Sequence, residues 1–214
     1  MHGTIVSVYD NSAGYRMQLG PEEIGTLPAP IIRASGDAEV TQDAEGTTVL
    51  ELFRMREDGK TASSLWVDRD FPLNHGLRIR TTFRLGADFA GKFRVTDRAV
   101  STADHVLILN LKPGFVAVPG SKKKVALPAD RWIDAEFMVH SPGNAWDVTL
   151  RADDKILLEE KGLPPAPDGA RVTKVNFIGW DMEAGKPTKV EVRRLEVEET
   201  GTRPPASAKR SHGN

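Results

Sequence analysis

Short segments in which apolar and polar residues alternate recur along most of the chain. The clearest lies at 77–85, where one parity holds Leu77, Ile79, Phe83 and Leu85 and the other holds Arg78, Arg80, Thr82 and Arg84. Such alternation is typical of a β-strand with one buried and one solvated face. Turn-forming residues separate these segments at the spacing of an all-β sandwich. We therefore expect an antiparallel β-sandwich and no long amphipathic helix.

Two further alternating runs, 133–140 and 146–151, flank the turn-forming loop Ser141-Pro142-Gly143-Asn144. This pattern predicts a hairpin, and Asp153-Asp154 predicts a second turn into a strand at 155–160. Further strands are expected at 47–56, 62–68, 91–98, 104–111, 170–178 and 187–198. Weaker alternation predicts strands at 3–9, 15–19, 30–41, 114–118 and 124–127. We expect one domain over 1–199, in which the pairing of 1–29 is not assigned, and a flexible tail or linker at 200–214.

The composition excludes several classes of protein. A length of 214 residues with 39% hydrophobic residues suits one sizeable core. The formal net charge of -1 provides no global basic field for nucleic acid or an anionic membrane, and no apolar run approaches the ~20 residues of a membrane span. The absence of cysteine excludes disulfides and thiol chemistry. The first residues lack a secretory signal pattern, so that either none exists or it was removed.

Three segments and a closing strand carry a resemblance to a known fold. The order Arg131 to Phe137, Asn144 to Leu150 and Val175 to Gly179, closed by Val190 to Val197, resembles the concanavalin A-like, laminin G-like jelly roll. The resemblance implies a jelly-roll sandwich, a glycan as partner, and an extracellular or periplasmic location. Where many relatives carry an Asp-Asn pair near a structural calcium, this chain has Arg193 and Arg194, and we expect no metal and no cofactor.

Arginines on the polar parity are the first candidate site. We predict that 77–85 pairs with 92–98 as a hairpin around 86–91, which places Arg78, Arg80, Arg84 and Arg94 on one face. Guanidinium groups bind carboxylate and sulfate groups through paired hydrogen bonds, so an acidic polysaccharide is one candidate ligand. The alternative is a solvated sheet face whose arginines pair with Asp134, Glu136 or Asp147.

Tryptophans are the second candidate, because aromatic faces stack on sugar rings. Trp180 follows the segment Phe177-Ile178-Gly179 and is expected to leave a strand into a loop, where ligand contacts are common. Trp66 is the second aromatic candidate. The alternative for both is packing in the core.

Carboxylates at 134 and 136 are the third candidate. Asp134 and Glu136 share one strand face with His140, and their α-carbons are expected about 6.5 to 7 Å apart. The row resembles the carboxylate ladder of laminarinase-type glycosidases, with one acid missing. Alginate-lyase-type jelly rolls use a Tyr and a His in catalysis, and the only tyrosines in this sequence are Tyr9 and Tyr15.

Three functions follow, in order of preference. The first is a non-catalytic carbohydrate-binding or accessory domain, with Arg78, Arg80, Arg84, Arg94, Trp66 and Trp180 as its ligand-binding residues. The second is a glycoside hydrolase or polysaccharide lyase that uses Asp134, Glu136 and His140. The third is a structural protein-interaction domain.

Overall fold

The structure is a computed structural model that describes residues 14–35, 37–53, 63–97, 105–166, 169–183 and 188–200. The side chains of 32–35, Ser63, Trp66, Asp68 and His105 also lie outside the description. The strand expected at 3–9 and the tail expected from 201 onward fall outside the described residues, as do Tyr9 and Arg98.

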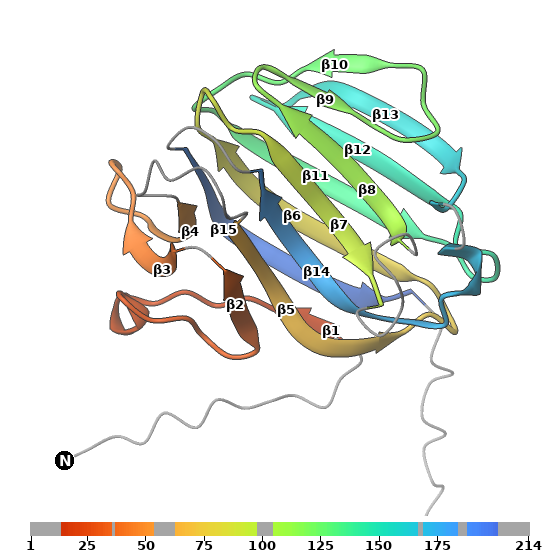
Figure 1. The fold of residues 1–214 in the computed structure, drawn as a ribbon, viewed down its shortest axis with the longest axis horizontal. Coiled ribbons are helices and arrows are strands. Elements are labelled where there is room, and N and C mark those ends of the chain that lie inside the picture. Colours follow the sequence, from red (N-terminus) through yellow and green to blue (C-terminus); the bar gives the residue numbers. More distant parts are fainter. Residues whose placement is uncertain are drawn as a thin grey trace, which may run out of the picture.

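Within these described residues, fifteen strands form two antiparallel sheets that stack face to face (Figure 1). Sheet A has the order β13-β12-β11-β6-β15-β4-β3, and β1 also pairs with β15. Its strands are β1 (Gly14–Arg16), β3 (Asp37–Gln42), β4 (Thr48–Phe53), β6 (Leu77–Leu85), β11 (Trp132–Val139), β12 (Trp146–Ala152), β13 (Lys155–Leu163) and β15 (Lys189–Glu199). This assigns part of the N-terminal region to a place beside the last strand.

Sheet B has the order β10-β9-β8-β7-β14-β5-β2. Its strands are β2 (Ile31–Ser35), β5 (Ser63–Pro72), β7 (Gly91–Thr96), β8 (His105–Lys112), β9 (Phe115–Ala117), β10 (Lys124–Ala126) and β14 (Lys174–Met182). Two 3-10 helices complete the described elements, η1 (Pro21–Glu23) and η2 (Gly169–Arg171). Neither is long and apolar enough to cross a membrane.

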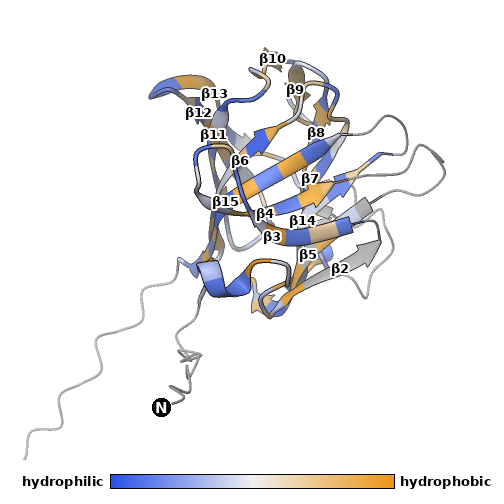
Figure 2. Cartoon of the chain, turned by 90° about the vertical axis from the view of Figure 1, so that its left-hand side faces the viewer, coloured by the Kyte–Doolittle hydropathy of each residue, from blue (hydrophilic) through white to orange (hydrophobic). Residues whose placement is uncertain are grey.

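The core lies between the sheets because each strand directs alternate side chains inward. Figure 2 shows hydrophobic and hydrophilic residues alternating along strands such as β15. Phe137 of sheet A and Phe93 of sheet B stack with ring centroids 5.1 Å apart, and Trp180 packs against Phe93 at 4.9 Å. Burial of these rings removes large apolar areas from water, which stabilises the stacked sheets.

The predicted hairpin of 133–140 and 146–151 is confirmed. β11 and β12 pair antiparallel, with Asp134 opposite Arg151 and Val139 opposite Trp146. The second predicted turn is also confirmed: Asp153 and Asp154 both have positive φ, at 49° and 61°, as a tight two-residue hairpin turn requires.

The predicted pairing of 77–85 with 92–98 is wrong. β6 pairs with β11 and β15 in sheet A, whereas β7 pairs with β8 and β14 in sheet B. Residues 86–90 therefore carry the chain from one sheet to the other. Both strands keep the predicted buried parity, but their buried faces meet across the core, so Arg94 lies on the opposite side of the molecule from Arg78, Arg80 and Arg84.

Candidate functional site

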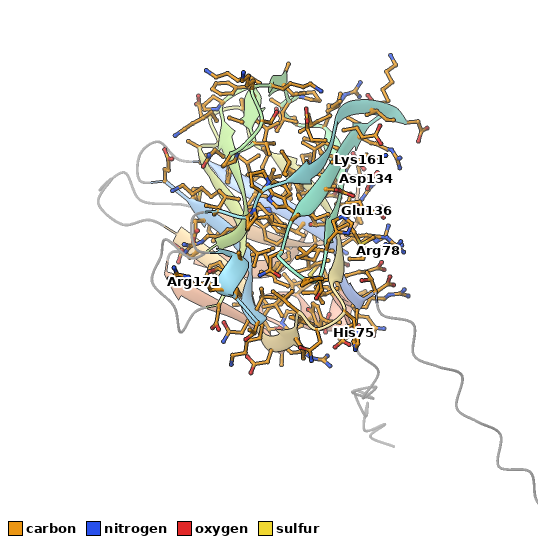
Figure 3. All side chains as sticks on the ribbon, turned by 90° about the vertical axis from the view of Figure 1, so that its right-hand side faces the viewer. His75, Arg78, Asp134, Glu136, Lys161 and Arg171 are labelled. Carbon is orange, nitrogen blue, oxygen red and sulfur yellow. The ribbon has the colours of Figure 1, made fainter. Side chains whose placement is uncertain are left out.

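The outer face of sheet A gathers most of the polar residues singled out in the sequence. Arg78, Arg80 and Arg84 project from β6, and Asp134 and Glu136 project from the neighbouring β11. Figure 3 shows Arg78, Asp134 and Glu136 along the same side of the molecule. The antiparallel register places Glu136 directly opposite Arg80.

The arginines of β6 are held in ion pairs. Arg80 contacts Glu136 at 3.0 Å, Glu196 at 3.6 Å and Glu198 at 3.8 Å, and Arg78 lies 4.0 Å from Glu198. The hydrogen bond to Glu136 raises the pKa of Arg80 above its ordinary value, against the opposing effect of burial. This agrees with the alternative interpretation of a sheet face with paired charges, although most of the acids come from β15.

Arg84 belongs to a more deeply buried network. It donates to Glu191 at 2.5 Å and contacts Asp43 at 3.3 Å and Glu45 at 3.6 Å. Burial by itself raises the pKa of Glu191, but hydrogen bonds from Arg84 and Lys189 and their positive charges bring it below the ordinary value. The network fastens the β3–β4 turn to the sheet, so the guanidinium of Arg84 is committed to a structural role.

Arg94 is engaged on the outer face of sheet B. Its guanidinium pairs with Asp181 at 2.5 Å and lies 4.4 Å from the ring centroid of Phe177. It therefore shares no ligand surface with the arginines of β6.

The structure describes the side chain of one of the two candidate tryptophans. Trp180 lies within β14 and is 1% exposed, so it contributes to the core instead of a loop. Trp66 lies in β5 opposite Gly179, and its side chain is outside the described residues.

A groove crosses the outer face of sheet A. It consists of two adjoining hollows, of about 310 and 530 Å³, which share Thr82, Asp134 and Arg194. We call the two together the sheet A groove. Its other lining residues include Arg80, Glu136, Thr149, Arg151, Asp154, Arg193, Thr47, Thr48 and Leu19.

Strand register explains why the groove runs across the strands. Cα partners link one residue from each of five neighbouring strands in a single row, Ile156, Arg151, Asp134, Thr82 and Arg194. Asp134 accepts a hydrogen bond from the Thr82 hydroxyl at 2.5 Å, and these short side chains form the floor between longer arginines. Thr82 is 3% exposed.

A β-bulge shapes one end of the groove. The register of β15 with β6 shifts between Val192 and Arg194, so Arg193 and Arg194 together occupy the position opposite Thr82. Both arginines are exposed and both line the same hollow. The sequence held a signal for this bulge that alternation alone missed: the buried residues Val192 and Leu195 are three positions apart instead of two.

Trp132 supports the arginine from the bulge. The guanidinium carbons of Arg193 and Arg84 each lie 4.5 Å from its ring centroid, a distance suited to cation–π attraction. Within the described part of the chain, no carboxylate lies within ion-pairing distance of Arg193. Its polar edge is therefore available to a ligand.

The candidate catalytic residues are not assembled into a single constellation. Asp134 and Glu136 both line the groove, where Asp134 accepts the hydrogen bond from Thr82 and Glu136 forms the ion pair with Arg80. His140 lies beyond β11 and contacts Asp147 at 2.9 Å through Nε2. Across the described ranges, no group of three or more acidic or histidine side chains is arranged to hold a metal ion.

Solved structures share this architecture. A protein of unknown function from Shewanella oneidensis MR-1 superposes with a TM-score of 0.62 at 14% identity, over 86% of this chain and 84% of that one. A seed lectin of Lotus tetragonolobus and the winged bean acidic lectin complexed with methyl-α-D-galactose each give 0.60 at 10% identity, over 86% of this chain and 96% of theirs. Neither a protein-family model nor a curated protein sequence matches the chain. The chain has the concanavalin A-like jelly-roll fold, as the sequence predicted.

Proposed function

We propose that the chain is a non-catalytic carbohydrate-binding domain that holds a glycan in the sheet A groove. The observation that carries this proposal is the groove itself, a polar hollow built on the central strands of a sheet. Side chains projecting from paired strands keep their spacing, so a ligand meets groups that are already in position.

The chemistry of the groove suits sugar hydroxyls. A hydroxyl both donates and accepts hydrogen bonds, and the groove offers carboxylate acceptors, guanidinium donors and the mixed capacity of Thr149. Asp134 uses one oxygen for the Thr82 hydroxyl and keeps acceptor capacity for a ligand. Charge-assisted bonds of this kind are about twice as strong as neutral ones.

An acidic polysaccharide is the finer proposal. Arg78, Arg80 and Arg84 are already compensated by glutamates, which reduces their contribution to anion binding. Arg193 and Arg151 have no carboxylate partner among the residues that the structure describes, and both line the groove. The arginines that support an acidic ligand are therefore different from those that the sequence pattern favoured.

Lectins of the same fold give general support to a sugar ligand. The winged bean lectin was solved with methyl-α-D-galactose and the lectin UEA-II with galactose. At 10 to 12% identity these likenesses concern the fold, and residues are not carried over from them. An extracellular or periplasmic location remains part of the proposal, to be tested by fractionation of the source cells.

The enzymatic alternative rests on Asp134. A glycosidase needs two carboxyl groups that face one bond, one of them acting as an acid. Glu136 instead serves as a partner of Arg80, and His140 is paired with Asp147. We therefore prefer binding to turnover, and keep the interaction-domain function as the outcome expected if no glycan binds.

A glycan screen tests the proposal directly. Neutral, uronate-bearing and sulfated polysaccharides are incubated with the wild-type protein, and binding and newly released reducing or unsaturated ends are read together. Binding without products is expected. Products would instead support the enzyme, and binding of no glycan would overturn the proposal.

A matched pair of variants locates the site. Asp134→Asn removes the carboxylate charge from the groove floor and is expected to weaken binding about 10-fold, from the loss of one charge-assisted hydrogen bond. Asp70→Asn makes the same change at an exposed carboxylate of β5 in sheet B, where Asp70 pairs with Lys174 at 3.0 Å, and is expected to leave affinity unchanged. Equal affinities for the two variants would place the glycan elsewhere.

A further inference from the structure

We infer that the ligand is an extended glycan chain that lies across the strands of sheet A, with an anionic group held at the β15 bulge. This inference rests on the proposed function and adds the orientation, the minimum length and the polarity of the ligand.

The orientation follows from the two hollows. One is lined mainly by residues of β12, β11 and β6, together with Arg194 of β15, and the other by residues of β11, β6, β15 and the start of β4. They meet at the shared floor residues Thr82 and Asp134. The groove therefore crosses five strands, and at a strand spacing of about 4.8 Å it is roughly 19 Å long. A single sugar ring fills only part of that length.

Neighbouring rows of side chains confine the ligand in the other direction. The floor pair Asp134 and Thr82 is flanked by two other cross-strand pairs, each two residues away along the strands. Trp132 and Arg84 form the pair on one side, and Glu136 and Arg80 form the pair on the other. At strand rise these rows lie about 7 Å from the floor row. A chain that ran parallel to the strands would have to pass over the ion pair of Arg80 and Glu136, whereas one that runs crosswise stays above Thr82 and Asp134.

Charge distinguishes the two ends. At the bulge end, Asp134 is the only carboxylate that lines the hollow shared with Arg193 and Arg194. The carboxylate of the nearby Glu196 already forms ion pairs with Arg194 at 2.6 Å, Arg16 at 3.0 Å and Arg80 at 3.6 Å.

Arg80 also pairs with Glu136 and Glu198, which leaves Glu196 with one negative charge for the guanidinium groups of Arg194 and Arg16. Burial raises the pKa of Glu196, but the hydrogen bond from Arg194 and the charges of Arg194, Arg16 and Arg80 bring it below the ordinary value. The excess positive charge at this end favours a carboxylate or sulfate of the ligand.

The far end is less positive and partly apolar. Arg151 lines the groove there together with Asp154. Beyond Arg151 in the same row lies Ile156, which is 55% exposed and is one of two large apolar side chains left exposed in the described residues. An apolar face of a sugar ring fits this position.

Calorimetry with oligosaccharides of increasing length tests the inference. We would use uronate oligomers from one to six units, a neutral series of the same lengths, and that neutral series in sulfated form. Affinity for at least one anionic series is expected to rise with length until the groove is filled, and to fall as salt is added. The better of the two anionic series identifies the anionic group.

Substitutions at three arginines resolve the two ends. Arg193→Ala is expected to weaken the binding of every anionic oligomer about 10- to 100-fold. Arg193→Lys should restore part of this affinity, because it returns the positive charge but not the paired hydrogen-bond donors of a guanidinium group. Arg151→Ala is expected to weaken only the longer oligomers. Arg131→Ala is the control, because Arg131 is an exposed arginine that pairs with Asp153 outside the groove lining.

The outcomes separate this inference from the proposed function. If no series binds, the proposed function itself fails. If glycans bind but monomers bind as tightly as hexamers, or Arg151→Ala affects all lengths equally, the crosswise chain is wrong. If neutral oligomers match anionic ones and Arg193→Ala has no effect, the anionic end is wrong while carbohydrate binding stands.

Discussion

Glutamine in place of Glu191 should destabilise the fold measurably. The Glu191 side chain is 4% exposed and accepts hydrogen bonds from Arg84 at 2.5 Å and from Lys189 at 2.9 Å. Charge-assisted bonds contribute about 1.5 to 3 kcal/mol each and neutral ones about half as much. Arg84 retains Asp43 and Glu45 in the variant, which limits the loss. We expect a loss of about 2 kcal/mol, equivalent to roughly 4 to 8 °C in Tm for a chain of this size.

Urea unfolding monitored by tryptophan fluorescence measures this change at several pH values. Because the pKa of Glu191 is lowered in the folded protein, its stabilisation is present above the unfolded value of about 4.3 and is lost as pH falls through the folded value. The difference between wild type and Glu191→Gln should be full at pH 7 and should shrink toward zero well below pH 4.

Glu198→Gln is the matched control on the same strand and face. Its side chain is 44% exposed and its arginine contacts are 3.8 and 4.0 Å long, so a change below about 1 kcal/mol is expected. If Glu191→Gln lies within about 0.5 kcal/mol of wild type at pH 7, or if its effect persists unchanged at pH 3, the charge network is not what stabilises this region.

Substitutions at three other positions give distinct expectations. Asn144→Ala should cost about 2 to 4 kcal/mol in urea unfolding, because buried Asn144 donates to the carbonyls of Gly169 and Val172 at 2.6 and 2.7 Å and has a φ of 57°. Asn144→Gly removes the cost of the positive φ but still loses both hydrogen bonds, so it should also be less stable than wild type. Wild-type stability for either variant would contradict this account. Trp180→Phe should leave glycan affinity within about twofold of wild type, as a buried core residue allows; loss of binding in a folded variant would place Trp180 in the site. Arg94→Ala should likewise leave affinity unchanged, since it lies on the opposite sheet, and a salt-dependent loss in calorimetry would refute that separation.

Local pattern determined much of the fold. Alternation in 77–85 and 133–139 identified which face of each strand is buried, because side chains of a strand point to opposite faces with a period of two. The loop Ser141-Pro142-Gly143-Asn144 predicted the β11–β12 hairpin, since its turn residues lie between two alternating runs. The structure adds the register of that hairpin, in which Asp134 stands opposite Arg151 and forms one half of the groove floor.

The sequence alone left open which strands become neighbours. Alternation predicts that Phe83 and Phe93 are buried, but it does not predict whether they lie in the same sheet. In the structure they face the core from opposite sheets. β6 instead pairs with β15, more than a hundred residues away. Such pairing depends on burying both sheets against each other, which is a property of the whole chain.

The same physics decided the site. Arg78, Arg80 and Arg84 were visible as a basic row, but the glutamates that neutralise them lie on β15 and become neighbours only when the last strand enters sheet A. The spacing of Val192 and Leu195 indicates the bulge that exposes Arg193 and Arg194 side by side. The position of this bulge beside Thr82 depends on the register between distant strands. Sequence periodicity sets the face of each residue; tertiary pairing sets which charges meet, and therefore which arginines are available to a ligand.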